Sequence, residues 1–312
     1  MQWLNMNLYQ RLFSVNGTLA ETVSKNVRVL CWIMTNPGNH RSKAVHVKAT
    51  WVTRCNGYFF ASTAAEPSLP TVKLNTSEGR EFLWEKTKLA LTYIYETSLD
   101  EYDWFMKADD DTYVIVENLR LMLLSYRPEQ PIYFGCRFKP FTKQGYMSGG
   151  AGYVMSKKAL TLFVEQGIRN NVCKDISTGH EDANLGICME KIGVTAGDSR
   201  DRFGRHRFLP FTPASHARPA TPDPSFWFWS YIYYPFSQGM GCCSDFAISF
   251  HYISPDDMYQ MEYLVYHVRP YGISRFSDKA YYSSQCPKEE SVDIAKNFSF
   301  DINSGMNPGS QQ

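Results

Sequence analysis

The chain has 312 residues, 44% of them hydrophobic, and its 32 Lys and Arg nearly balance 31 Asp and Glu to leave a formal charge of +1. A chain of this length can bury a large core, which excludes general disorder, and its balanced charge excludes a non-specific attraction to nucleic acid or anionic lipid. No apolar run approaches the roughly 20 residues that cross a bilayer, so either the chain is soluble or its anchor lies outside this sequence.

Strand and helix patterns alternate through the first half of the chain. Residues 1–26 are polar and mixed, which suggests a stem, and "VRVLCWIMT" at 27–35 is apolar on both faces, as a central parallel strand is. The patterns that follow predict a helix at 41–51, a strand at 57–63, a helix at 79–97, a strand at 103–108, a helix at 116–126 and a strand at 131–138. This alternation predicts an α/β fold around a mostly parallel sheet, with a ligand site beyond the carboxyl ends of the strands.

The composition changes after residue 200. Prolines punctuate an aromatic segment, "SFWFWSYIYYPF" at 225–236, which we interpret as a long excursion over the sheet. A strand is predicted at 247–254, and the residues after about 276 are polar and Ser-rich, which is typical of a mobile tail. The predicted organisation is therefore a stem over 1–26, one folded domain over 27–275 and a tail over 276–312.

The cysteines and sequons favour an oxidising compartment. The eight cysteines lack the paired C-x-x-C spacing of zinc sites, and Cys242 and Cys243 are adjacent. N-x-[ST] sequons occur at Asn16, Asn75 and Asn297, and they can be used only in a secretory lumen. The even cysteine count and the sequons together indicate disulfides, although the sequence leaves open which cysteines pair.

Three aspartates, Asp109 to Asp111, directly follow the strand at 103–108. A run of Asp is often only a solvated turn or a helix cap. At the carboxyl end of a buried strand, however, adjacent carboxylates repel one another unless a cation joins them. Asp109 and Asp111 point the same way on an extended chain, so they can share one Mg²⁺ or Mn²⁺. The spacing does not fit a calcium loop, and we predict a site for one of these two ions.

A second motif, "GYMSGGAGYVMSKKAL" at 145–160, places Gly149 and Gly150 before a strand and before a helix that Ser156 caps. The glycines fit a flexible turn and a close backbone approach to a ligand equally well. On the strand at 247–254, His251 is either a structural residue or a nitrogen ligand. An imidazole added to two carboxylates would suit Mn²⁺ better than calcium.

Glu181 and Asp182 stand at the start of a predicted helix that ends at Gly193. Carboxylates in this position are often simple partners of the helix dipole. The same dipole favours the ionised carboxylate that a general base needs. Asp182 is therefore the candidate for removing a proton from a hydroxyl group.

The absent motifs narrow the reaction class. The chain has no G-x-x-x-x-G-K-[ST] loop and no G-x-G-x-x-G after a strand, so kinase, P-loop and dinucleotide-binding functions lose their main support. A metal held by two carboxylates keeps open positions that a phosphate-bearing substrate commonly fills. An acidic D-x-D in an α/β fold suggests a nucleotide-sugar transferase whose metal holds a diphosphate leaving group.

Several longer segments resemble one enzyme family. The segments "VLCWIMTNP", "HVKATW", "WFMKADDDTYVIVENLR", "FKPFTKQGYMSGGAGYVMS", "AGDSRD", "GCCSD" and "YLVYHVRPYGI" are similar to the animal core 1 β1,3-galactosyltransferases of the β1,3-glycosyltransferase family, from about residue 27 to about 274. The resemblance implies a GT-A fold, an inverting mechanism, UDP-galactose as donor and Mn²⁺ as cofactor. It also implies an acceptor N-acetylgalactosamine α-linked to Ser or Thr of a glycoprotein, and a type II Golgi membrane protein, often a homodimer, whose anchor this chain lacks.

The resemblance also implies roles for individual residues. The metal ligands would be Asp109, Asp111 and His251, and the catalytic base would be Asp182. The donor would be bordered by Thr35, Asn36, Pro37, Arg41, Asp110, Gly149 and Gly150. For the acceptor we predict Glu181 and an aromatic wall of Trp227, Trp229 and Tyr234, because the C–H face of a sugar packs on aromatic rings. Core packing explains these three aromatic residues equally well.

Two other functions stay open. A fringe-like transferase that moves N-acetylglucosamine to O-fucose would keep the fold and change the sugars. A non-catalytic relative that acts as a folding chaperone would be expected to lack the D-x-D motif, so the presence of Asp109, Asp111, Asp182 and His251 favours catalysis.

Overall fold

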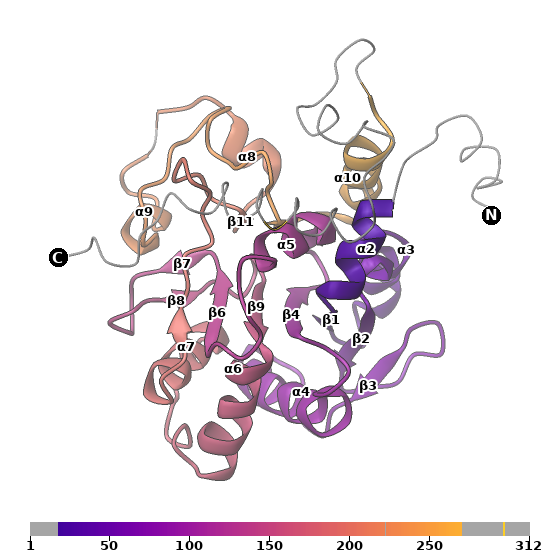
Figure 1. The fold of residues 1–312 in the computed structure, drawn as a ribbon, viewed down its shortest axis with the longest axis vertical. Coiled ribbons are helices and arrows are strands. Elements are labelled where there is room, and N and C mark those ends of the chain that lie inside the picture. The colour runs from indigo at the N-terminus through magenta and orange to yellow at the C-terminus, as the bar shows by residue number, and fades with distance from the viewer. Residues whose placement is uncertain (1–17, 222, 270–295, 297–312) are drawn as a thin grey trace.

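A seven-stranded sheet forms the centre of the computed structural model, which describes residues 18–221, 223–269 and 296. Its strand order is β10-β6-β9-β4-β1-β2-β3 (Figure 1). The strands are β1 (Val29–Met34), β2 (Gly57–Ser62), β3 (Thr71–Lys73), β4 (Trp104–Asp109), β6 (Ile132–Gly135), β9 (Tyr153–Ser156) and β10 (Thr195–Ala196). Every neighbouring pair is parallel except the two that involve β9, which runs against β4 and β6. This sheet confirms the predicted α/β fold.

Helices cover both faces of the sheet (Figure 1). One layer contains α2 (Thr18–Asn26), α3 (Val45–Ala49), α5 (Val116–Leu123) and α10 (Pro255–Tyr266), and the opposite layer contains α4 (Leu83–Ser98), α6 (Lys157–Leu162) and α7 (Glu181–Lys191). Shorter π and 3-10 segments are η1 (His40–Ala44), η2 (Trp51–Arg54), η3 (Arg80–Phe82) and η4 (Phe163–Arg169).

The central strand β1 is buried on both sides, as its sequence predicts. Val29, Cys31 and Ile33 pack into the core beside α5, whereas Leu30, Trp32 and Met34 pack into the core beside α4. All six side chains are buried, and burial of each large apolar side chain stabilises the fold by roughly 1.5–3 kcal/mol. The sheet therefore holds the carboxyl ends of β1 and β4 side by side, where Met34 pairs in register with Asp109.

The remaining strands form two small sheets. A three-stranded sheet joins β5 (Tyr113–Val114), β12 (Ser249–Phe250) and β11 (Phe208–Leu209), and a hairpin joins β7 (Arg137–Phe138) to β8 (Tyr146–Met147). Helix α8 (Pro213–Ala217) precedes the aromatic excursion at 225–236, which carries α9 (Phe228–Tyr231). The excursion packs Phe228 and Ile232 into the same core as β1.

One predicted strand is much shorter than its pattern. The strand expected at 247–254 is confined to Ser249–Phe250, so His251 follows the strand rather than standing within it. The reason is Tyr252, whose φ of 58° lies in the left-handed region that ends an extended chain. The predicted helix at 116–126 likewise ends earlier, at Leu123.

Three disulfides occur in the described part of the chain. They join Cys31 to Cys55, Cys173 to Cys188, and the adjacent Cys242 to Cys243. Cys136 is a free, buried thiol. Burial raises its pKa well above the usual value, so its thiol stays protonated and unreactive.

The predicted tail lies almost wholly outside the described residues, as does the predicted stem before α2. The helix α2 itself buries Val23 against the core. None of the helices among the described residues is long and apolar enough to pass through a lipid bilayer.

Candidate active site

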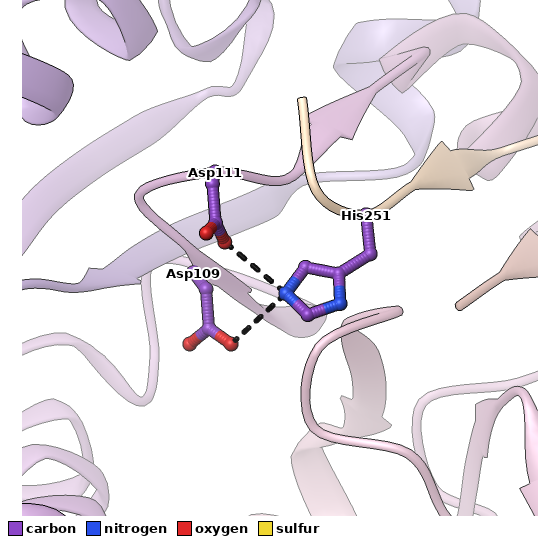
Figure 2. Close-up of side chains that lie close together, drawn as sticks. All are labelled: Asp109, Asp111 and His251. Atoms are coloured by element: carbon purple, nitrogen blue, oxygen red, sulfur yellow. Dashed lines mark ion pairs between the residues drawn. The ribbon is translucent and has the colours of Figure 1, made fainter. Parts of the chain in front are cut away.

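The aspartate run forms a tight turn at the end of β4. The amide N–H of Thr112 donates to the carbonyl oxygen of Asp109 at 3.1 Å, and the chain then enters β5. Asp109 and Asp111 consequently face the same side, where His251 meets them from beyond β12 (Figure 2). His251 Nε2 lies 3.1 Å from Asp111 Oδ1 and 4.0 Å from Asp109 Oδ2. The structure thus brings together the three predicted metal ligands.

These three side chains suit a divalent cation. One ligand atom from each lies within 4.8 Å of the other two. Ligands at about 2.0–2.3 Å from a shared ion stand up to about 4.5 Å apart, so small side-chain rotations would complete the set. Two carboxylates and an imidazole are a donor set for Mn²⁺ and similar first-row ions.

Gly150 makes room for the histidine. A β-carbon at this position would lie 2.2 Å from His251 Cε1, which no real side chain tolerates. The carbonyl oxygen of Gly150 also accepts a hydrogen bond from the Thr112 hydroxyl at 2.8 Å, which joins the glycine segment to the aspartate turn. Gly150 therefore makes room for one of the predicted metal ligands, a contact that the motif alone did not indicate.

Asp111 is held ionised by its neighbours. Burial alone would raise the pKa of this carboxyl, but the His251 ring and the Lys43 ammonium lower it to about 2. Lys43 Nζ donates to Asp111 Oδ2 at 2.9 Å. Lys43 was not among the predicted site residues, although it lies within the predicted helix at 41–51.

Asp110 points away from the candidate metal site. Its Oδ2 accepts hydrogen bonds from Thr35 Oγ1 at 2.7 Å and from Asn39 Nδ2 at 2.9 Å. Burial raises the pKa of Asp110 to about 6 in spite of these donors. The carboxyl thereby fixes the loop that leaves β1, and Lys86 Nζ fixes it from the other side by donating to the carbonyl oxygen of Thr35 at 2.6 Å.

The predicted donor residues between Thr35 and Arg41 lie in two places. Thr35 and Asn36 lie in this loop, with Pro37 beside them, and Asn36 Oδ1 accepts from the amide N–H of Asn39 at 3.1 Å. Arg41 lies further out, with 87% of its side chain exposed, and pairs with Glu66 at 3.6 Å. The structure therefore brings Thr35 to the aspartate run and leaves Arg41 at the surface.

Asp182 stands in the first turn of α7, facing the glycine segment. Its Oδ2 accepts from the amide N–H of Gly149 at 3.0 Å, and its Oδ1 accepts from the amide N–H of Ala183 at 2.9 Å. A carboxylate oxygen has two lone pairs, so each oxygen keeps one for a substrate hydroxyl. The half-buried carboxylate therefore has the geometry of a general base.

Glu181, the neighbouring predicted acceptor residue, is tied down more firmly. Its Oε1 accepts from Thr87 Oγ1 at 2.7 Å and from the Tyr153 hydroxyl at 2.9 Å. Burial raises the pKa of Glu181, and the Lys107 ammonium opposes that shift. These contacts hold the first turn of α7 against α4 and β9.

A line of aromatic rings approaches the same helix end. Trp227 is 45% exposed and its ring lies 5.9 Å from that of Phe138. Tyr146 continues the line, 5.8 Å from Phe138, and Phe141 lies 5.9 Å beyond it. Phe141 in turn packs 6.0 Å from His180, the residue before Glu181. The exposed Phe141 has a φ of 74°, which is uncommon for a bulky residue. Phe141 was not among the predicted site residues.

The other two predicted acceptor residues are placed differently. Tyr234 is buried, its hydroxyl accepts from Arg137 Nη1 at 2.7 Å, and the Arg200 guanidinium lies 3.6 Å above its ring. Trp229 lines a separate pocket of about 350 Å³, together with Phe211, Phe226, Phe228 and Phe236. Of the three predicted residues, Trp227 is therefore the one with an exposed ring in the line of aromatic contacts that leads to His180.

The chain is similar in sequence to several known glycosyltransferases. A family model described as Fringe-like matches residues 25–207. Glycoprotein-N-acetylgalactosamine 3-beta-galactosyltransferase 1 of Xenopus laevis is 51% identical over 277 residues, which cover 86% of this chain and 76% of that protein. Chondroitin sulfate synthase 3 of Mus musculus is 26% identical over 52% of this chain and 20% of its own length. Beta-1,3-glucosyltransferase of Mus musculus is 29% identical over 50% of this chain and 32% of its own length.

Proposed function

Because the chain belongs to the Fringe-like family of glycosyltransferases, we propose that it transfers galactose from UDP-galactose to N-acetylgalactosamine α-linked to Ser or Thr. The bond would form at the 3-hydroxyl of the acceptor sugar and give the core 1 O-glycan of glycoproteins. The observation that carries the choice of sugars is the 51% identity to a galactosyltransferase over most of the chain. The more distant relatives match only about half of it.

The chemistry would be a single displacement with inversion at the anomeric carbon. Asp182 takes the proton from the acceptor hydroxyl as the oxygen of that hydroxyl attacks the anomeric carbon of galactose from the face opposite UDP. The amide N–H of Gly149 holds that carboxylate in place at the first turn of α7. General-base assistance of this kind contributes about 10²–10⁴-fold to a rate.

Asp109, Asp111 and His251 would hold Mn²⁺. An ion there would supply positive charge for the departing UDP. The remaining contacts come from the chain itself: Thr35 and Asn36 border the nucleotide, and Gly149 and Gly150 lie near the transferred sugar. Trp227 and Phe141 offer ring faces to the acceptor.

The same proposal includes the cellular compartment of the enzyme. Three disulfides among the described residues are consistent with the oxidising lumen of the secretory pathway, and we propose the Golgi as the compartment. A type II membrane anchor outside this chain and a homodimer stay predictions.

Donor and acceptor competition tests the choice of sugars. Purified protein is given UDP-galactose and UDP-N-acetylglucosamine together, with two peptides, one bearing α-linked N-acetylgalactosamine and the other O-fucose. The proposal predicts that galactose is transferred to the first peptide alone. N-acetylglucosamine on the fucosyl peptide would instead assign the fringe-like activity, and UDP binding without any transfer would favour the non-catalytic role.

A further inference from the structure

Lys107 is a buried cation that the reaction described above does not use. It lies on β4, two residues before Asp109, and its side chain is only 3% exposed. Successive side chains of a strand alternate between faces, so Lys107 and Asp109 share the face that α7 covers. A buried ammonium group is tolerated only where it is paired and hydrogen-bonded.

Its contacts reach both parts of the candidate active site. Nζ donates to Asp109 Oδ1 at 2.6 Å and to the carbonyl oxygen of Gly149 at 3.0 Å. Asp109 thus uses Oδ1 for the lysine and turns Oδ2 toward His251. Gly149 in turn donates its amide N–H to Asp182 Oδ2 at 3.0 Å. A continuous set of hydrogen bonds therefore runs from a metal ligand through Lys107 and Gly149 to the base.

The surroundings of Lys107 exclude a mobile side chain. The Tyr153 ring lies 5.8 Å from Nζ, and Tyr153 pairs with Lys107 across β4 and β9. A β-carbon on Gly149 would stand 3.5 Å from Nζ and 3.1 Å from Glu181 Oε2. The ammonium is therefore enclosed between β9, the glycine segment and the first turn of α7.

We propose that Lys107 is a positioning residue that holds Asp109 and Asp182 in their catalytic orientations at once. It fixes which oxygen of Asp109 faces the ion, and through Gly149 it fixes the carboxylate that receives the acceptor proton. This inference rests on the proposed function of Asp182 as the base.

Lys43 provides the matched comparison within the same site. Its Nζ bonds Asp111 Oδ2 at 2.9 Å and approaches Asp110 Oδ1 at 3.8 Å, while its side chain is 35% exposed. These contacts stop at the aspartate run. Loss of Lys43 should weaken metal binding only, whereas loss of Lys107 should also misplace the base.

The test compares Lys107→Met and Lys107→Gln with Lys43→Met and the unaltered protein. Methionine nearly keeps the length and volume of the lysine without its charge, and glutamine keeps an uncharged NH₂ donor group. The measurements are kcat and both KM values over a range of Mn²⁺ concentrations, UDP affinity by calorimetry and the melting temperature. The unaltered protein is assayed first, so that an inactive unaltered protein refutes the proposed function and not the role of Lys107.

For folded Lys107 variants we expect a loss in kcat of at least about 100-fold, as a misplacement near 1 Å can cause. UDP affinity and acceptor KM should stay within about threefold of the unaltered protein, and excess Mn²⁺ should not restore kcat. Excess Mn²⁺ should restore most of the activity of Lys43→Met. A retained kcat, a Lys107 variant that Mn²⁺ rescues, or unfolding of both Lys107 variants would each overturn the positioning role.

Discussion

Residues whose type alone suggests no function, such as Lys107 and Gly150, set the geometry of this site. The motifs and the family resemblance together singled out Asp109, Asp111, Asp182 and His251, because carboxylates and imidazoles are the groups that bind a cation or take a proton. The structure brings Asp109, Asp111 and His251 together, and the roles of all four residues stay predictions. Lys43 and Lys107 could not be predicted in the same way. Their roles depend on which segments the sheet brings within 3 Å, and a lysine in a sequence carries no such information.

Gly150 offers the sharpest test at this scale. Gly150→Ala would place a methyl group 2.2 Å from His251 Cε1, so the imidazole must leave the two aspartates. We expect metal affinity and activity to fall about 10- to 100-fold, the usual effect of disturbing a metal ligand. The measurement is the Mn²⁺ concentration that gives half-maximal activity.

Gly241→Ala is the control for that substitution. A β-carbon at Gly241 meets nothing within 4 Å, so this variant should keep the Mn²⁺ dependence of the unaltered protein. Equal Mn²⁺ dependence of both variants would show that Gly150 does not support the site.

The base gives a second residue-scale prediction. Asp182→Asn preserves the shape of the side chain but removes the charge, and transfer should fall about 10²–10⁴-fold because an amide cannot take the acceptor proton. UDP binding, measured by calorimetry with Mn²⁺, should be nearly unchanged. A collapse of nucleotide affinity together with transfer would count against the base role.

At the scale of elements, hydrophobic periodicity predicted that the core strands and helices exist, but it did not predict where they begin and end. The two-sided apolar pattern of 27–35 predicted β1, since burial on both faces leaves no polar alternative. The strand at 247–254 was overpredicted because its alternation continues through Tyr252, whose backbone turns away. Tertiary contacts of His251 with the aspartates, which no local pattern encodes, accompany that turn.

The disulfide between Cys173 and Cys188 anchors α7, the helix that carries the candidate base. It joins the segment after η4 to the middle of α7, whose first turn carries Asp182. A cross-link of 15 residues stabilises a fold by about 3 kcal/mol in the loop-entropy view. The double variant Cys173→Ala and Cys188→Ala should lose roughly that free energy of unfolding in denaturant titration. An unchanged free energy of unfolding would mean that the packing of α7 alone holds it.

At the scale of the whole molecule, the aromatic excursion is the part that the sequence described least well. Its composition identified a long ordered segment, but not how the rings pack. The rings of His206 and His216 both pack against Phe236, with ring centroids 4.8 and 5.1 Å away. His216 Nε2 accepts from the amide N–H of Phe211 at 3.2 Å, so the ring must be neutral there.

These two histidines predict an acid-sensitive fold. Burial lowers the pKa of each to about 4, whereas an unfolded histidine has a pKa near 6.5. The unfolded chain therefore binds more protons between about pH 6.5 and pH 4, and stability is present above this window and falls as the pH decreases through it.

We expect each histidine to reduce the free energy of unfolding by roughly 2 kcal/mol between pH 7 and pH 5. Denaturant titrations of the unaltered protein and of His216→Gln across this range measure the effect. His216→Gln should show a shallower dependence on pH, and identical slopes would remove His216 from the explanation.

The most direct test of the whole account is the structure of its product. UDP-galactose and a peptide bearing α-linked N-acetylgalactosamine are incubated with the protein, once with Mn²⁺ and once with EDTA, and the linkage is assigned by NMR. The account predicts galactose joined β1→3 to the N-acetylgalactosamine with Mn²⁺ and no product with EDTA. An α-linked galactose, attachment to another hydroxyl, or equal yield in EDTA would contradict it.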